Sequence, residues 1–170
     1  PRSSAASDVY KRQETNSLDP HQADLIGVSL SSKVGKACYI PIGHNSKKCI
    51  NKDVVLNKLK PLLEDSSIKK IGQNIKFDFI VLFKHGITIS SIEDTMLMSY
   101  VLDAGKNRHN MDTLSEIHLD HKTITFKELV GSGKKEISFG EVDIEKAKDY
   151  AAEDADITFR LYKKFLKSLK

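Results

Sequence analysis

Two stretches near the start of the chain alternate between apolar and polar residues, which is the pattern of half-buried β-strands. They cover Asp24–Ser32 and Lys36–Ile42, and only residues 33–35 separate them. So short a connection predicts an antiparallel hairpin of two neighbouring strands.

The rest of the chain is dominated by helical spacing, with apolar residues recurring at steps of three and four. We expect Pro61 to kink or shorten the last turn of the first helix. The expected helices are Lys52–Leu63, Asn74–His85, Asp94–Leu102, Met111–Leu119, Thr125–Val130 and Asp143–Leu169, and two short strands are expected at Ser67–Gly72 and Ile87–Ile92. Early strands followed by alternating strands and helices predict an α/β fold, a mixed central sheet flanked by helices.

The first thirteen residues show neither the alternation of a β-strand nor the spacing of an α-helix. They read PRSSAASDVYKRQ and contain no apolar stretch of the kind found in secretory signals. We interpret residues 1–13 as a leader that is not native to the domain, with a native disordered tail as the alternative. Residues 14–170 are then the domain, and its first strand is incomplete.

Composition and charge narrow the class of protein. Of 170 residues, 39% are hydrophobic and 29% are charged, as expected for one soluble domain and not for a disordered or membrane-spanning chain. The net charge of +4 permits a nucleic-acid or phosphate partner without identifying one. Cys38 and Cys49 form no CxxC pair, which fits a reducing cytoplasm and predicts neither a disulfide nor a zinc site.

Three acidic residues stand beside apolar neighbours, where a solvated charge is not expected. They are Glu14, Asp78 and Asp154, and each taken alone is better explained as a turn residue or an exposed helix residue. Taken together, they offer oxygen ligands from separate segments, which is what two Mg²⁺ ions acting on a phosphodiester require. Tyr150 lies four residues before Asp154 and therefore on the same helix face, where a phenol can orient an attacking water.

These residues belong to three motifs, namely ETNSLD from Glu14, GQNIKFD ending at Asp78, and YAAEDAD from Tyr150. The motifs resemble those of the proofreading 3′-5′ exonuclease domain of bacterial DNA polymerase I, in polymerase family A. RHNMDTL from Arg108 and HKTITF ending at Phe126 resemble the same domain, so the likeness spans residues 14–170. The Tyr-x-x-x-Asp spacing is similar to that of the tyrosine subclass of DEDD exonucleases.

The resemblance implies a ribonuclease H-like fold that removes nucleotides from DNA 3′ ends. It also implies two divalent cations, Mg²⁺ or Mn²⁺, with Zn²⁺ as an alternative. By this resemblance Glu14 and Asp154 ligate the first cation, Asp78 serves the second, partly through water, and Tyr150 positions the nucleophile. Contacts to a single-stranded or frayed 3′ end are expected from Leu18, Gln73, Asn74, Lys76, Phe77, Arg108 and Phe126.

One position departs from the family pattern. The first motif of the family is Asp-x-Glu, whereas Arg12 stands two residues before Glu14 in this chain. A guanidinium in place of a carboxylate shared by two cations removes a ligand and adds a like charge. We therefore expect impaired metal binding and activity, and hypothesise that the natural gene product has an aspartate here and that the chain is a fragment of a longer polymerase.

Three functions stay open at this point. The first is a proofreading exonuclease for DNA replication and repair, covalently linked to a polymerase domain in the bacterial cytoplasm and without a membrane partner. The second is an RNase D-like RNA 3′ exonuclease, which shares the acidic motifs, although the segment from Arg108 to Phe126 favours the polymerase family. The third is a non-catalytic nucleic-acid-binding or scaffold domain beside a polymerase, and Arg12 favours this alternative.

Overall fold

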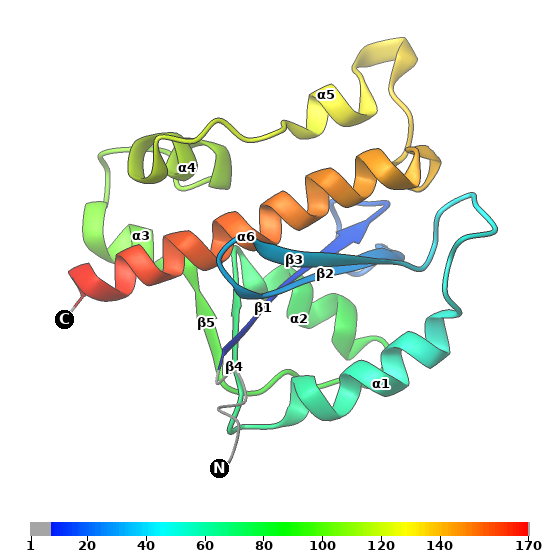
Figure 1. Cartoon of the computed structure of the whole chain (residues 1–170), viewed down its shortest axis with the longest axis horizontal. Coiled ribbons are helices and arrows are strands. Elements are labelled where there is room, and N and C mark those ends of the chain that lie inside the picture. The colour runs from blue at the N-terminus through cyan, green and yellow to red at the C-terminus, as the bar shows by residue number, and fades with distance from the viewer. Residues whose placement is uncertain (1–7, 170) are drawn as a thin grey trace.

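A mixed five-stranded sheet forms the centre of the molecule (Figure 1). This computed structural model describes residues 8–169, with side chains from residue 14 onward except that of residue 134. The strands are β1 (Asp8–Thr15), β2 (Leu25–Lys33), β3 (Lys36–Pro41), β4 (Lys69–Gly72) and β5 (Ile92–Asp94). Their order is β3-β2-β1-β4-β5, antiparallel from β3 to β1 and parallel from β1 to β5. The predicted α/β class, with its mixed sheet and its hairpin, is confirmed.

All six predicted helices are present, and each begins and ends within two residues of the prediction. They are α1 (Lys52–Glu64), α2 (Ile75–Phe83), α3 (Thr95–Asp103), α4 (Met111–Leu119), α5 (Phe126–Val130) and α6 (Ile144–Ser168), and two short 3₁₀ turns, η1 (Gly133–Lys135) and η2 (Phe139–Glu141), precede α6. The Asn51 side chain accepts hydrogen bonds from the backbone N–H groups of Asp53 and Val54 and so begins α1. The helix continues through Pro61 to Glu64, so the proline does not shorten its last turn.

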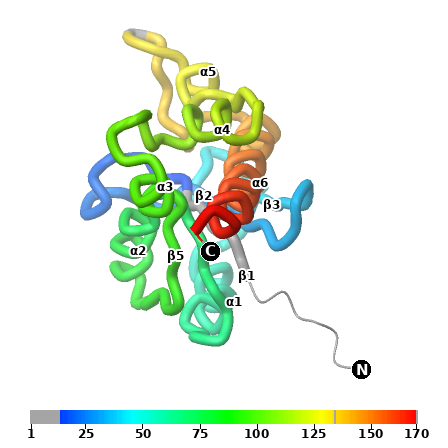
Figure 2. Tube along the Cα trace, turned by 90° about the vertical axis from the view of Figure 1, so that its left-hand side faces the viewer, coloured from blue at the N-terminus to red at the C-terminus, as the bar shows by residue number. Residues whose placement is uncertain are grey.

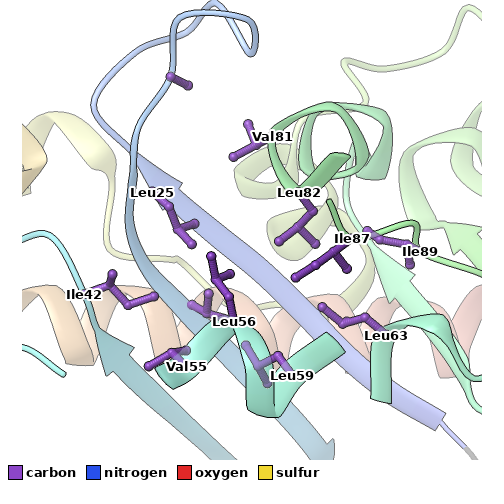
Figure 3. Packing of buried hydrophobic residues seen from close by; sticks show 12 residues of the cluster. Leu25, Ile42, Val55, Leu56, Leu59, Leu63, Val81, Leu82, Ile87 and Ile89 are labelled. Carbon is purple, nitrogen blue, oxygen red and sulfur yellow. The ribbon is translucent and has the colours of Figure 1, made fainter. Parts of the chain in front are cut away.

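Helices cover both faces of the sheet (Figures 1 and 2). On one face, α1 and α2 pack on β2, and their buried side chains form one apolar cluster (Figure 3). On the other face lies α6, whose 25 residues cross the sheet and contact α3, α4 and α5. Its Tyr150 and Ala151 pack on Ile26 of β2, while Ile157 and Leu161 pack near Ile71 of β4. The apolar stripe that predicted this long helix is the surface that it buries.

The central strand β1 includes residues that the sequence analysis left out of the domain. The first strand was expected to be incomplete, and the structure begins β1 at Asp8 and pairs it with both β2 and β4. A strand between two neighbours is held by backbone hydrogen bonds on both edges, so its place in the sheet does not require an alternating side-chain pattern. That these residues are foreign to the domain remains a prediction.

A correction concerns the segment between α2 and α3. A strand was expected over Ile87–Ile92, but β5 covers only Ile92–Asp94. The alternation in this segment arises because Ile87 and Ile89 are buried against α1 and α2 in a connection that is not part of the sheet. Burial of every second side chain thus gave the signal of a strand without strand pairing.

No helix within residues 8–169 is both long and apolar enough to cross a lipid bilayer.

Candidate active site

A cavity of about 690 Å³ opens where β1 ends, beside the N-terminal ends of α2 and α4. Its lining comes from segments that are far apart in the sequence, including α5, η2 and α6. Eight of the eleven residues expected to form the site line it, namely Glu14, Leu18, Gln73, Asn74, Phe77, Asp78, Phe126 and Tyr150. The fold thus brings most of the predicted site residues into one cavity, while their individual roles remain predictions.

The other three expected residues do not line the cavity. Asp154 is buried in α6, one turn after Tyr150, and its backbone carbonyl accepts a hydrogen bond of 2.8 Å from the Thr158 hydroxyl. Lys76 is exposed in the first turn of α2. Arg108 is exposed in the loop before α4, two residues from Asn110, which does line the cavity.

The three carboxylates of the predicted site are all buried. Glu14, Asp78 and Asp154 are 5%, 6% and 1% exposed, and they come from β1, α2 and α6. Asp and Glu are seldom buried in an ordinary core, so three buried carboxyl groups in neighbouring elements make this region a candidate functional site.

The fit to a divalent cation is incomplete. Carboxylate oxygens are the donors that Mg²⁺ prefers, so the donor type is suitable. However, among the described side chains no three His, Cys, Asp or Glu residues come together as a metal-holding group. The side chain of Arg12, at the position of the family's shared carboxylate, lies outside the described ones. The geometry therefore does not assign a cation to this chain.

A polar pair of one buried and one partly buried side chain lies near Glu14. Glu14 pairs with Gly27 across β1 and β2, and a Cβ atom added at Gly27 would lie 2.1 Å from the hydroxyl oxygen of Tyr39. That hydroxyl lies 2.6 Å from Nε2 of His44. Burial, together with the negative charge of Glu14, raises the pKa of Tyr39, whereas burial lowers the pKa of His44. A neutral imidazole therefore faces a phenol that keeps its proton.

Three aromatic side chains, Phe126, Phe139 and Tyr150, line one part of the cavity. The rings of Phe126 and Phe139 are stacked with centroids 6.2 Å apart, and Tyr150 meets each of them at 6.1 Å. Phe139 and Tyr150 are buried, but Phe126 is 45% exposed. Leu18, on another segment of the cavity lining, is 96% exposed. Exposed apolar and aromatic side chains at a cavity are suited to contacting the face of an unstacked base.

The sequence did not reveal part of the lining. The segment between α5 and α6 contributes Glu136, Ile137, Ser138 and Phe139. Its only signal was three apolar residues, Ile137, Phe139 and Val142, in an otherwise polar run too short to show a period. Other residues not singled out are Thr15, Asn16, Ser17, Met96, Asn110, Met111 and Asp112.

The sequence model of a protein family described as 3′-5′ exonuclease matches residues 2–170 of this chain. DNA polymerase I of Rhizobium leguminosarum is 44% identical over 170 positions covering 88% of this chain, and that of Pseudomonas aeruginosa is 43% identical over 163 positions covering 92%. The matched regions are only 17% and 18% of those two proteins, so the chain spans less than a fifth of each.

Among solved structures, Brucella melitensis NrnC matches with a TM-score of 0.73 and 26% identity, over 96% of this chain and 73% of NrnC. Escherichia coli RNase D, an exoribonuclease, matches with a TM-score of 0.68 and 14% identity, over 95% of this chain and 39% of RNase D. The second likeness concerns the fold alone. These neighbours confirm the expected ribonuclease H-like fold.

Proposed function

Because the chain belongs to the family of 3′-5′ exonuclease domains found in DNA polymerase I, we propose that its cavity binds the 3′ end of a DNA strand for proofreading. The observation that carries the proposal is the convergence of eight predicted site residues on one cavity. A covalently linked polymerase domain is the proposed partner, since the relatives are much longer than this chain.

The lining suits a frayed single strand. Exposed Leu18 and Phe126 offer apolar contacts to bases, while Gln73 and Asn74 offer carboxamide groups that can both donate and accept hydrogen bonds. A strand end entering between these side chains would have its terminal phosphodiester near Glu14, Asp78 and Tyr150.

For hydrolysis, we assign Tyr150 the orientation of the attacking water. Its ring is fixed by contacts with Phe126 and Phe139, so its hydroxyl has a defined position at the cavity. Glu14, Asp78 and Asp154 are the proposed cation ligands, and Arg12 is the proposed cause of impaired activity.

Restoring the carboxylate at position 12 tests the catalytic proposal. We expect Arg12→Asp to bind Mn²⁺ in a calorimetric titration and to shorten 5′-labelled single-stranded DNA from its 3′ end when Mg²⁺ is added. The unchanged chain serves as the matched control and should do both far more weakly. If Arg12→Asp neither binds the ion nor cleaves DNA, the catalytic proposal is wrong.

Two other functions are outcomes of the same experiment. Cleavage of an RNA of the same sequence, with the DNA left intact, would favour an RNA 3′ exonuclease like the RNase D that shares the fold. Binding of the DNA by both forms without cleavage by either would favour a non-catalytic nucleic-acid-binding domain.

A further inference from the structure

The turn between β4 and α2 carries an asparagine in an unusual position. Asn74 is the N-cap residue of α2 and has left-handed backbone angles, φ 58° and ψ 47°. An N-cap asparagine usually accepts a hydrogen bond from a backbone N–H within its own helix. The Asn74 side chain makes no such capping bond, and it lines the cavity. Its carboxamide is therefore not used to begin the helix.

A carboxylate from another strand takes over the capping. Asp94, at the end of β5, accepts the backbone N–H of Asn74 at Oδ1, at 3.0 Å, and that of Ile75 at Oδ2, at 2.9 Å. Its Oδ1 also accepts the N–H of Met96 at 2.8 Å and so begins α3. One buried carboxylate thus lies at the N-terminal ends of two helices, where a negative charge is stabilised.

Thr95, the residue after Asp94, contacts Gly72 and Gln73 in the same turn between β4 and α2. The hydroxyl of Thr95, which is fully buried, lies 3.1 Å from the carbonyl oxygen of Gly72 and 2.5 Å from Oε1 of Gln73. The amide nitrogen of Gln73 donates to the carbonyl oxygen of His109 at 2.8 Å. Through Gln73, the turn is therefore connected to the loop that precedes α4.

That loop is itself held by α3. Nδ1 of buried His109 lies 2.8 Å from the Ser99 hydroxyl, and its ring packs on Tyr100 with centroids 3.8 Å apart. His109 is followed by Asn110, which lines the cavity. Residues at the start and in the middle of α3 thus hold two separate segments of the cavity lining, the turn before α2 and the loop before α4.

We propose that Asp94 is a positioning residue for nucleotide binding, because it caps α2 in place of Asn74 and leaves the Asn74 carboxamide available to the terminal nucleotide of a strand. Thr95 assists by fixing Gln73 in the orientation that reaches His109. This inference rests on the proposed function for the identity of the ligand, but the capping arrangement does not depend on it.

Two substitutions and their combination test the inference. Asn74→Gly keeps the left-handed backbone, which glycine adopts readily, and removes the carboxamide. Asp94→Asn keeps the shape of the side chain but leaves one fewer acceptor for the backbone N–H groups that it faces. The binding of a short single-stranded oligodeoxythymidylate is measured in EDTA, so that hydrolysis does not consume the probe.

We expect each single variant to raise the Kd roughly tenfold. A tenfold change is about 1.4 kcal/mol of binding free energy, which is the usual contribution of one hydrogen bond. The double variant should also show a loss of about tenfold, because both changes act through the same carboxamide. A loss near a hundredfold in the double variant would mean that Asp94 acts independently of Asn74, and it would overturn the inference. An unchanged Kd for Asn74→Gly would overturn it as well.

Hydrogen exchange gives a readout that needs no ligand. In Asp94→Asn, the backbone N–H groups of Asn74 and Ile75 should exchange faster, whereas the rest of α2 should change little. The matched control is Asp65→Asn, because Asp65 also accepts a backbone N–H in a turn, from Ser67 at 2.8 Å, and does not line the cavity. This control should leave the Kd of the oligonucleotide unchanged.

The outcomes separate the inference from the proposed function. If the unchanged chain binds the oligonucleotide but exchange at Asn74 and Ile75 is unaffected in Asp94→Asn, only the inference fails. If exchange rises as expected but the unchanged chain binds no oligonucleotide, the capping role is supported while the proposed function and the nucleotide ligand both fail.

Discussion

The hydroxyl of Tyr39 lies 2.6 Å from Nε2 of His44, and the Tyr39 side chain lies directly against the backbone of Gly27. Gly27 pairs with Glu14 in the neighbouring strand, so the pair forms the support behind one carboxylate of the candidate site. The His44 ring also packs on Phe139 with centroids 5.5 Å apart, and Phe139 packs on Tyr150. Glu14 and Tyr150 are thus held by neighbours that contact each other.

Gly27→Ala should destabilise the fold. The added Cβ would lie within 2.4 Å of two ring carbons of Tyr39 and of its hydroxyl oxygen, so the partly buried ring would have to shift. We expect a loss of about 1–3 kcal/mol in the free energy of unfolding, measured by urea denaturation. In a Tyr39→Ala background the same glycine substitution should cost less, and equal costs in the two backgrounds would contradict this explanation.

Stability should fall when the pH drops below about 6.5. Burial lowers the pKa of His44 in the folded chain, so between pH 6.5 and that lower value only the unfolded chain takes up the proton. Burial lowers the pKa of His85 and His118 as well, so all three residues contribute in the same direction. Thermal unfolding from pH 8 to pH 5 should therefore show a declining midpoint.

The contribution of His44 can be separated from the other two. In His44→Gln the decline between pH 6.5 and pH 5 should be shallower, because one of the three groups no longer titrates. His21→Gln changes an exposed histidine and should follow the unchanged chain. A pH profile of His44→Gln identical to that of the unchanged chain would exclude His44 as a contributor.

Tyr150→Phe should remove activity without removing the fold. In the Arg12→Asp form, we expect the rate of DNA shortening to fall roughly a hundredfold, which is within the usual range for losing a group that handles the attacking water. The phenyl ring keeps the contacts with Phe126 and Phe139, so the variant should still unfold in one cooperative thermal transition. Tyr100→Phe, outside the cavity lining, is the matched control and should keep the rate.

Phe126→Ala should weaken the binding of single-stranded DNA more than its exposure would suggest. Stacking of one base on an aromatic ring contributes about 1–3 kcal/mol, so the Kd of a short oligonucleotide should rise by about fivefold or more. Phe83→Ala removes a ring that is 61% exposed and outside the cavity lining, and it should leave the Kd unchanged. Equal effects of the two substitutions would show that Phe126 has no special role.

Local patterns predicted the helices and their beginnings well. The Asp94 side chain was expected at the N-terminal end of α3, and it caps that helix. Its bonds to Asn74 and Ile75 could not be predicted, because they join residues about twenty positions apart through a turn with no hydrophobic period. The hydrogen bond from the Gln73 side chain to the carbonyl of His109 could not be predicted for the same reason.

The candidate site residues were predicted from motifs, whereas the residues that support them carried no motif. Tyr39 lies in a strand that was predicted from alternation, but alternation alone does not show that its hydroxyl meets His44 beyond the end of that strand. The Phe139 ring follows a short polar run, and only the folded chain places it against Phe126 and Tyr150. Contacts between separate segments were therefore the part that local patterns missed.

The central position of β1 sets an order on folding. Its antiparallel pairing with β2 joins neighbouring segments of the chain, whereas its parallel pairing with β4 must close a much longer loop. The part of the cavity lining around Glu14 is therefore expected to form early, and the part with Asn74 and Asp78 only when β4 docks. A chain stalled between these steps would display a native-like hairpin and no cavity, so an intact cavity marks the completion of folding.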